Sequence, residues 1–138
     1  MSIFSRIRQK LVVASDETPV ESPASQAPTP DRIDLTQGLD AYRDGARFID
    51  VREPHEWAQG HIAGAVHRPV GDIEADARLS VSPDTPVVTY CAAGARAARA
   101  AAVLNAHGYL NVKALAVGYG DWAQAGYPIE RPADEPET

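Results

Sequence analysis

The chain has 138 residues and a formal net charge of −6, with 44% hydrophobic and 23% charged residues, values typical of a globular protein with one domain-sized core. The acidic balance argues against nucleic acid as a partner, because no excess of basic side chains is present to neutralise phosphates. The single cysteine, Cys91, excludes an internal disulfide and indicates a reducing compartment, which we expect to be the cytoplasm.

The first 31 residues differ in composition from the rest of the chain. Apolar side chains recur at helical spacing over residues 1–13, with basic side chains between them. This segment is either a short helix that touches an anionic membrane or a frayed terminus, and its apolar run is too short for a secretory signal. The stretch rich in proline, serine and alanine up to residue 31 predicts a disordered linker, and residues 131–138 predict a disordered acidic tail. The folded domain is therefore expected over residues 32–130.

Strand and helix patterns alternate within this domain. Short runs rich in apolar and β-branched residues predict strands, and segments with apolar residues three or four apart predict helices. The strands are expected at 32–34, 47–51, 65–67, 86–90 and 111–115, and the helices at 35–44, 54–59, 70–79, 96–107 and 119–125. This alternation predicts the α/β class, with a mainly parallel central sheet and helices on both faces.

Cys91 follows the clearest strand and precedes the clearest helix. In a parallel sheet such a junction lies at the carboxyl edge, where ligands bind. The residues after the cysteine have small side chains or none, so their N–H groups can converge on an anion such as a thiolate, next to the positive end of a helix. The predicted cradle consists of the backbone N–H groups of Ala92, Ala93, Gly94, Ala95 and Arg96, and Arg96 adds a positive charge.

A buried structural cysteine at a strand end explains the same local pattern. This stretch alone therefore leaves both a reactive and an inert thiol open. The 4 histidines are scattered along the chain, so no Cys–His pair typical of a cysteine protease stands out. One cysteine and dispersed histidines also match no metal-ligand spacing, and we expect neither a metal nor a cofactor.

Four segments in order resemble the rhodanese family of sulfurtransferases. IDVREPHEWAQGHIAGAVHRP, residues 49–69, is similar to the family's D-x-R-x-x-x-E-[YFW]-x-x-G-H-I-x-G-A segment. YCAAGAR, residues 90–96, resembles its C-x-x-G-x-R loop, and the helix and strand over residues 97–115 follow in the same order. VGYGDWAQAGYPIE, residues 117–130, resembles its closing G-G-x-x-x-W-x-x-x-G-x-P-[VI] segment.

The resemblance implies a single rhodanese-like domain and a persulfide mechanism. Cys91 would take the outer sulfur of thiosulfate or a similar donor and pass it to cyanide, a thiol or a protein acceptor. Three departures leave the substrate preference open. Val117 stands where the family often has a glycine, and Ala92 and Ala97 replace frequent basic or polar residues, so the loop offers fewer side-chain donors.

Two other functions remain as alternatives. A rhodanese-like domain can act as a persulfide carrier or a regulatory binding module without turnover of its own. Cdc25-type phosphatases and arsenate reductases of this fold resemble the chain less closely, because their loop is C-x5-R whereas Cys91 to Arg96 is C-x4-R. The shorter loop favours a sulfur atom over a tetrahedral phosphate.

Asp50 and Arg52 lie directly after a predicted strand, on the side of the sheet where Cys91 is expected. They match the family's first segment, and we expect them to support the architecture rather than to react. Asp50 is expected to pair with Arg52 or with Arg96. His61 is expected to be a turn residue that hydrogen-bonds to the backbone.

Overall fold

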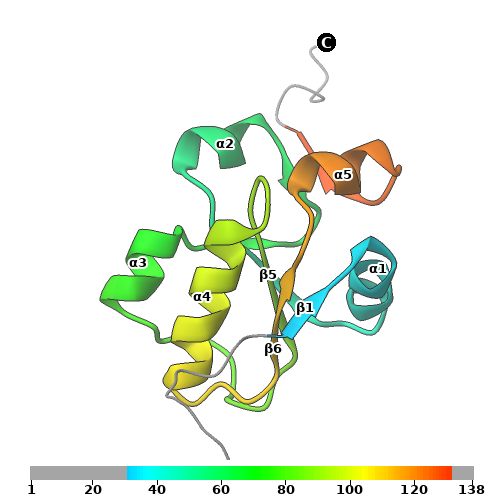
Figure 1. The fold of residues 1–138 in the computed structure, drawn as a ribbon. Coiled ribbons are helices and arrows are strands. Elements are labelled where there is room, and N and C mark those ends of the chain that lie inside the picture. The colour runs from blue at the N-terminus through cyan, green and yellow to red at the C-terminus, as the bar shows by residue number, and fades with distance from the viewer. Residues whose placement is uncertain (1–30, 132–138) are drawn as a thin grey trace, which may run out of the picture.

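The computed structural model describes residues 31–131. The predicted N-terminal helix and almost all of the predicted linker and acidic tail lie outside the described residues. The last residue of the predicted linker, Asp31, is instead the first residue of a strand. Within the described residues, the chain alternates between strands and helices (Figure 1). The elements are β1 (Asp31–Ile33), α1 (Leu35–Arg43), β2 (Arg47–Asp50), α2 (Pro54–Gln59), β3 (His61–Ile62), β4 (Val66–His67), α3 (Val70–Ala75), β5 (Val87–Tyr90), α4 (Ala95–Ala106), β6 (Val112–Leu115), α5 (Tyr119–Gln124) and β7 (Ile129–Glu130).

Five strands form a parallel sheet in the order β1-β6-β5-β2-β4. The sheet therefore confirms the predicted α/β class. The strand β5 lies at its centre between β6 and β2, so the loop after Tyr90 emerges at the middle of the carboxyl edge. All four residues of β5 are buried, as expected for a strand covered on both faces.

Two apolar clusters cover the two faces of the sheet. Alternate residues of β5 divide between them: Val87 belongs to the cluster that holds α3 and α4, and Val88 to the cluster that holds α1 and α5. Figure 1 shows α3 and α4 on one side of the sheet and α1 on the other. The buried face of α4 consists mainly of alanines, which let the helix approach the sheet closely.

The helix predicted over residues 70–79 is shorter than expected, because α3 ends at Ala75. The Arg68 guanidinium donates hydrogen bonds to the carbonyl oxygens of Asp76 (2.6 Å) and Arg78 (2.7 Å). The Asp76 carboxylate in turn accepts from the backbone N–H and the guanidinium of Arg78. These contacts give the backbone carbonyl and N–H groups of residues 76–78 hydrogen-bond partners without a helix, so α3 does not continue.

A second, two-stranded sheet was not predicted. The strands β3 and β7 pair antiparallel, with His61 opposite Glu130 and Ile62 opposite Ile129. Each strand has two residues, too few for an alternating pattern to indicate a strand. The pairing joins the chain after α2 to the last strand of the domain.

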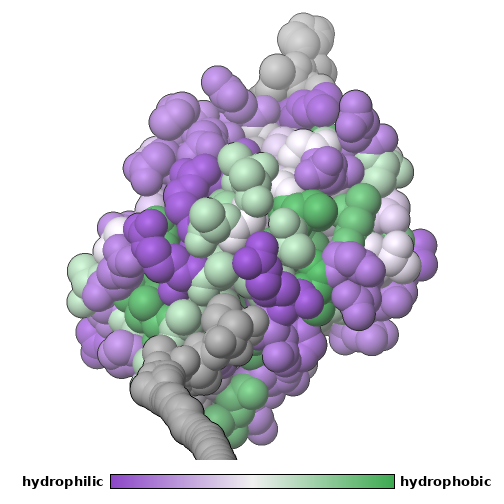
Figure 2. Space-filling view, in the orientation of Figure 1, coloured by the Kyte–Doolittle hydropathy of each residue, from purple (hydrophilic) through white to green (hydrophobic). Residues whose placement is uncertain are grey.

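The large apolar side chains exposed in the described part of the chain are Val66 and Leu110. Figure 2 shows hydrophobic residues in small areas among hydrophilic ones on the face it presents. Scattered exposed apolar residues of this kind are normal for a protein surface that faces water.

Candidate active site

The Cys91 thiol lies at the carboxyl end of β5, one residue beyond the strand. Only 1% of the residue is exposed. Its Sγ accepts a hydrogen bond from the backbone N–H of Gly94 at 3.0 Å and a longer one from Ala97 at 3.4 Å. Both donors stabilise negative charge on sulfur, and Ala97 belongs to the first turn of α4, whose dipole acts in the same direction.

The loop between β5 and α4 carries further N–H donors. Of the five N–H groups expected to form a cradle, one, that of Gly94, contacts the sulfur. Sequence reasoning did not identify the Ala97 donor, because its distance from the sulfur depends on how the helix begins. Within residues 31–131, four N–H groups beside the sulfur have no hydrogen-bond acceptor: those of Ala92 and Ala93 in the loop, and those of Ala95 and Arg96 at the start of α4.

The connection from β6 to α5 packs against the backbone of this loop. The N–H of Tyr119 donates to the carbonyl oxygen of Cys91 at 2.9 Å. A Cβ at Gly118 would lie 1.6 Å from the carbonyl oxygen of Ala92, so only glycine fits there. Gly94 has φ +107°, and a Cβ on it would lie 2.8 Å from the carbonyl oxygen of Ala116. The two glycines therefore fix the shape of the loop through backbone contacts alone.

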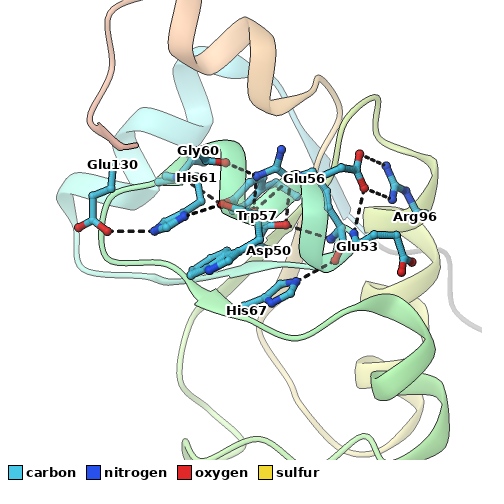
Figure 3. Close-up of polar contacts among 12 residues, drawn as sticks. Asp50, Glu53, Glu56, Trp57, Gly60, His61, His67, Arg96 and Glu130 are labelled. Carbon is cyan, nitrogen blue, oxygen red and sulfur yellow. Dashed lines mark hydrogen bonds and ion pairs between the residues drawn. The ribbon is translucent and has the colours of Figure 1, made fainter. Parts of the chain in front are cut away.

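Arg96 forms an ion pair with Glu56, which sequence reasoning did not identify. The Nη1 and Nη2 groups of Arg96 donate to the two carboxylate oxygens of Glu56 at 2.8 and 3.1 Å (Figure 3). Hydrogen bonding from Arg96 lowers the pKa of Glu56 to about 2, so the carboxylate is charged at neutral pH. The signal for this partner was present, since Glu56 is the acid of the D-x-R-x-x-x-E spacing.

Asp50 pairs with Arg52, one of the two arginines expected as its partner. The carboxylate is fully buried and accepts from Arg52 through Nε at 3.0 Å and Nη2 at 2.6 Å, and from the Arg52 backbone N–H at 2.9 Å. Arg52 Nη2 also donates to the carbonyl oxygen of Gly60 at 2.6 Å. Its guanidinium lies 4.5 Å from the centre of the Tyr119 ring. The pair thus ties β2 to the end of α2 and contacts the residue that holds the Cys91 carbonyl.

His61 is the first residue of β3 rather than a turn residue, although it does hydrogen-bond to the backbone. Its Nδ1 lies 3.1 Å from the carbonyl oxygen of Trp57, and its Nε2 lies 3.0 Å from Glu130 Oε1. The Trp57 ring stacks against His61 at 3.5 Å and against His67 at 4.8 Å between ring centres (Figure 3). These stacked rings support α2, the helix that carries Glu56.

Between residues 31 and 131, no three side chains of the histidine, cysteine, aspartate and glutamate types are grouped as metal ligands would be. None of the helices over those residues combines the length and the apolar character that crossing a membrane requires.

Comparisons with known proteins place the whole domain in relation to a family and its fold. The family model described as "Rhodanese-like domain" matches residues 34–125. A protein of Allochromatium vinosum named "Sulfurtransferase" is 40% identical over 103 residues, which is 74% of this chain and 94% of that protein. "Thiosulfate sulfurtransferase 16, chloroplastic" of Arabidopsis thaliana is 30% identical over 119 residues, 78% of this chain and 98% of that protein. The solution structure of a rhodanese-like domain from Anabaena has the same fold, with a TM-score of 0.67 at 24% identity, over 76% of this chain and 82% of that one.

Proposed function

Because the chain belongs to the rhodanese-like domain family, we propose that it is a sulfurtransferase that carries sulfane sulfur as a persulfide on Cys91. The observation that supports this most directly is the pair of N–H groups on Cys91 Sγ, with four more donors of the loop and the first turn of α4 left without an acceptor among the described residues. A persulfide is an anion one atom longer than a thiolate. The unused donors can serve that outer atom or the donor's leaving group.

The proposed transfer has two steps. The Cys91 thiolate attacks the outer sulfur of thiosulfate, an Sγ–S bond forms, and the S–S bond of thiosulfate breaks with its electron pair leaving on sulfite. An acceptor such as cyanide, the thiolate of a small thiol or a protein thiolate then attacks the outer sulfur. A bond forms between the acceptor and that sulfur, and the Sγ–S bond breaks with its electron pair returning to the Cys91 thiolate. Both steps move sulfur between anions, so neither needs a general base, a metal or a cofactor.

The roles of the other residues follow from their contacts. The backbone of Ala92, Ala93, Gly94 and Ala95 forms the anion cradle, and Arg96 places a cation in the first turn of α4. Asp50 and Arg52 are positioning residues, because they bond to each other, and Arg52 bonds to Gly60, rather than to the sulfur. The proposed partners are a small sulfur donor and a protein acceptor, in a reducing compartment such as the cytoplasm.

The test is the intact mass of the protein after incubation with thiosulfate in the absence of reductant. Cys91 is the only cysteine, so Cys91→Ser is a matched control without any thiol. A gain of one sulfur atom in the wild type and none in the variant supports the proposal. Release of many equivalents of thiocyanate per protein, with thiosulfate and cyanide both in excess, separates a turning-over enzyme from a carrier, which releases one. A wild type that gains no sulfur but hydrolyses a phosphate ester or reduces arsenate contradicts the proposal in favour of the related chemistry.

A further inference from the structure

Arg32 is a basic residue of the edge strand β1, and its side chain lies on the same face of the sheet as α4. It pairs in parallel register with Ala114 of β6, which belongs to the apolar cluster that holds α3 and α4. The next residue, Ile33, belongs to the cluster on the other face. Successive side chains of a strand point to opposite faces, so Arg32 extends along the α4 face, where it is exposed to solvent.

The Arg32 guanidinium lies beside the loop that surrounds the thiol. Its Nη2 is 3.7 Å from the position that a Cβ on Gly94 would take. The backbone N–H of Gly94 donates to Cys91 Sγ at 3.0 Å. Two covalent bonds of about 1.5 Å separate that Cβ position from the amide nitrogen, so the guanidinium lies within about 10 Å of the sulfur. At that distance its charge acts on an anion that approaches the thiol, unless salt screens it.

The positive charge of Arg32 has no paired counter-charge in the part of the chain that the structure describes. None of the ion pairs among those residues includes Arg32. Arg96 differs in this respect, because its guanidinium donates to both carboxylate oxygens of Glu56, at 2.8 and 3.1 Å. The carboxylate offsets much of the Arg96 charge, whereas Arg32 contributes a net positive charge beside the loop.

We propose that Arg32 is a specificity-determining residue that favours anionic sulfur donors, thiosulfate in particular, over uncharged ones. This inference rests on the proposed function, because it concerns the approach of a donor to the same thiol. Arg32 stands two residues before the family match begins at residue 34, so the resemblance assigns it no role. It acts through its charge rather than through a bond to the sulfur, and it is therefore not a catalytic residue.

The physical reason is the negative charge that thiosulfate carries throughout the transfer. The donor approaches as a dianion, which the Cys91 thiolate repels, and a guanidinium beside the loop offsets that repulsion. As the Sγ–S bond forms, the S–S bond of thiosulfate breaks and its electron pair leaves on sulfite, which is also an anion. Arg32 therefore interacts favourably with the donor from its approach to the release of sulfite. Its effect should appear in the second-order rate constant of sulfur loading.

The experiment compares Arg32→Gln with Arg47→Gln. Both variants remove one positive charge from an exposed strand arginine that takes part in none of the ion pairs of the described residues. Arg47 begins β2, at the opposite edge of the sheet from Cys91, and Arg32→Lys serves as a variant that keeps the charge. Cys91 is alkylated with iodoacetate and with iodoacetamide, which are similar in size and differ by one charge, and loading by thiosulfate is followed by mass. The iodoacetamide rate corrects for any change in the reactivity or exposure of the thiol itself.

At low ionic strength, Arg32→Gln is expected to lower the iodoacetate-to-iodoacetamide rate ratio about twofold, and thiosulfate loading relative to iodoacetamide about fourfold, since thiosulfate carries twice the charge. Both losses should shrink as salt is added, and Arg32→Lys and Arg47→Gln should stay near the wild type. Equal ratios in all four proteins, a loss in Arg32→Gln that salt does not reduce, or no reaction of Cys91 with either reagent overturn the proposal. The alkylation ratio needs no sulfur transfer, so a lowered ratio without sulfur loading of the wild type would contradict the proposed function and leave the charge effect standing.

Discussion

The carbonyl oxygen of Ala92 occupies the place where the Cβ of any residue other than glycine at position 118 would lie. The two residues are 26 positions apart in the sequence, and their backbones meet because β6 lies beside β5. The connection after β6 therefore packs directly against the backbone of the Cys91 loop. The shape of the loop depends on that connection as much as on its own residues.

Gly118→Ala is expected to displace the loop, because a Cβ 1.6 Å from the Ala92 carbonyl oxygen forces one backbone to move. A displacement near 1 Å at a reacting group lowers rates by about a hundredfold, so sulfur loading of Cys91 should fall by that order. The measurement is the rate of mass gain with thiosulfate. Gly120→Ala is the matched control, since nothing lies within 4 Å of a Cβ added there, and loading at the wild-type rate in both variants would contradict the prediction.

Asp50→Asn is expected to destabilise the fold by about 3–5 kcal/mol, because it leaves the buried Arg52 guanidinium without its counter-charge. The measurement is the free energy of unfolding from urea titration. Asp31→Asn provides the comparison, since the Asp31 side chain is 74% exposed and its 3.6 Å contact with Lys113 is a surface one. Similar small losses in the two variants would show that the Asp50–Arg52 pair contributes little.

The ion pair of Glu56 makes the free energy of unfolding depend on pH in the acid range. The pKa of Glu56 is lowered in the folded protein to about 2 from 4.5, chiefly by hydrogen bonding from Arg96, so the folded state binds its proton less readily than the unfolded state. The contribution is complete above pH 4.5 and is lost as the pH falls from there towards 2. Wild type and Glu56→Gln should therefore differ by about 1 kcal/mol in unfolding free energy at neutral pH and converge in acid. A difference that stays constant from neutral pH to pH 3 would argue against this assignment.

Thr89→Val is expected to cost about 1 kcal/mol of unfolding free energy. The buried Thr89 Oγ1 donates to the carbonyl oxygen of Ala97 at 2.8 Å, which ties the first turn of α4 to the strand that ends before Cys91. Valine keeps the volume but not the donor. Thr36→Val, at an exposed position of α1, should leave stability nearly unchanged, and equal effects at the two positions would show that the Thr89 hydrogen bond adds nothing.

The sequence predicted the sheet and the place of the thiol well, because both depend on local patterns. The apolar run before Cys91 and the alanine-rich helix after it required no knowledge of the rest of the fold. The partner of Arg96 could not be predicted from a local pattern. Glu56 lies 40 residues earlier in the sequence, and the two meet only because α2 and the start of α4 rise from the same edge of the sheet.

Two further features depended on geometry that spacing does not encode. The Ala97 N–H reaches the sulfur because Gly94 turns the chain with a positive φ just before the helix begins. The end of α3 depends on Arg68 bonding to carbonyl oxygens eight and ten residues later. In both cases a side chain or a turn offers the backbone an alternative to regular helical hydrogen bonding. The spacing of apolar residues in the sequence does not indicate which of the two is more stable.

The ring stack around Trp57 gives the protein an optical signal of its own. Trp57 is partly exposed, stacks against His61 and directly follows Glu56, whereas the other tryptophan, Trp122, is fully buried in the core. Emission from a stacked indole changes when its neighbours move, so Trp57 fluorescence reports on α2. Trp122 emission reports on the core. The emission of Trp57→Phe comes from Trp122 alone, and subtracting it from the wild-type emission gives the part due to Trp57. A change in the Trp57 part alone indicates a local rearrangement beside Arg96, such as the arrival of a donor, and a change in both parts indicates loss of the whole fold.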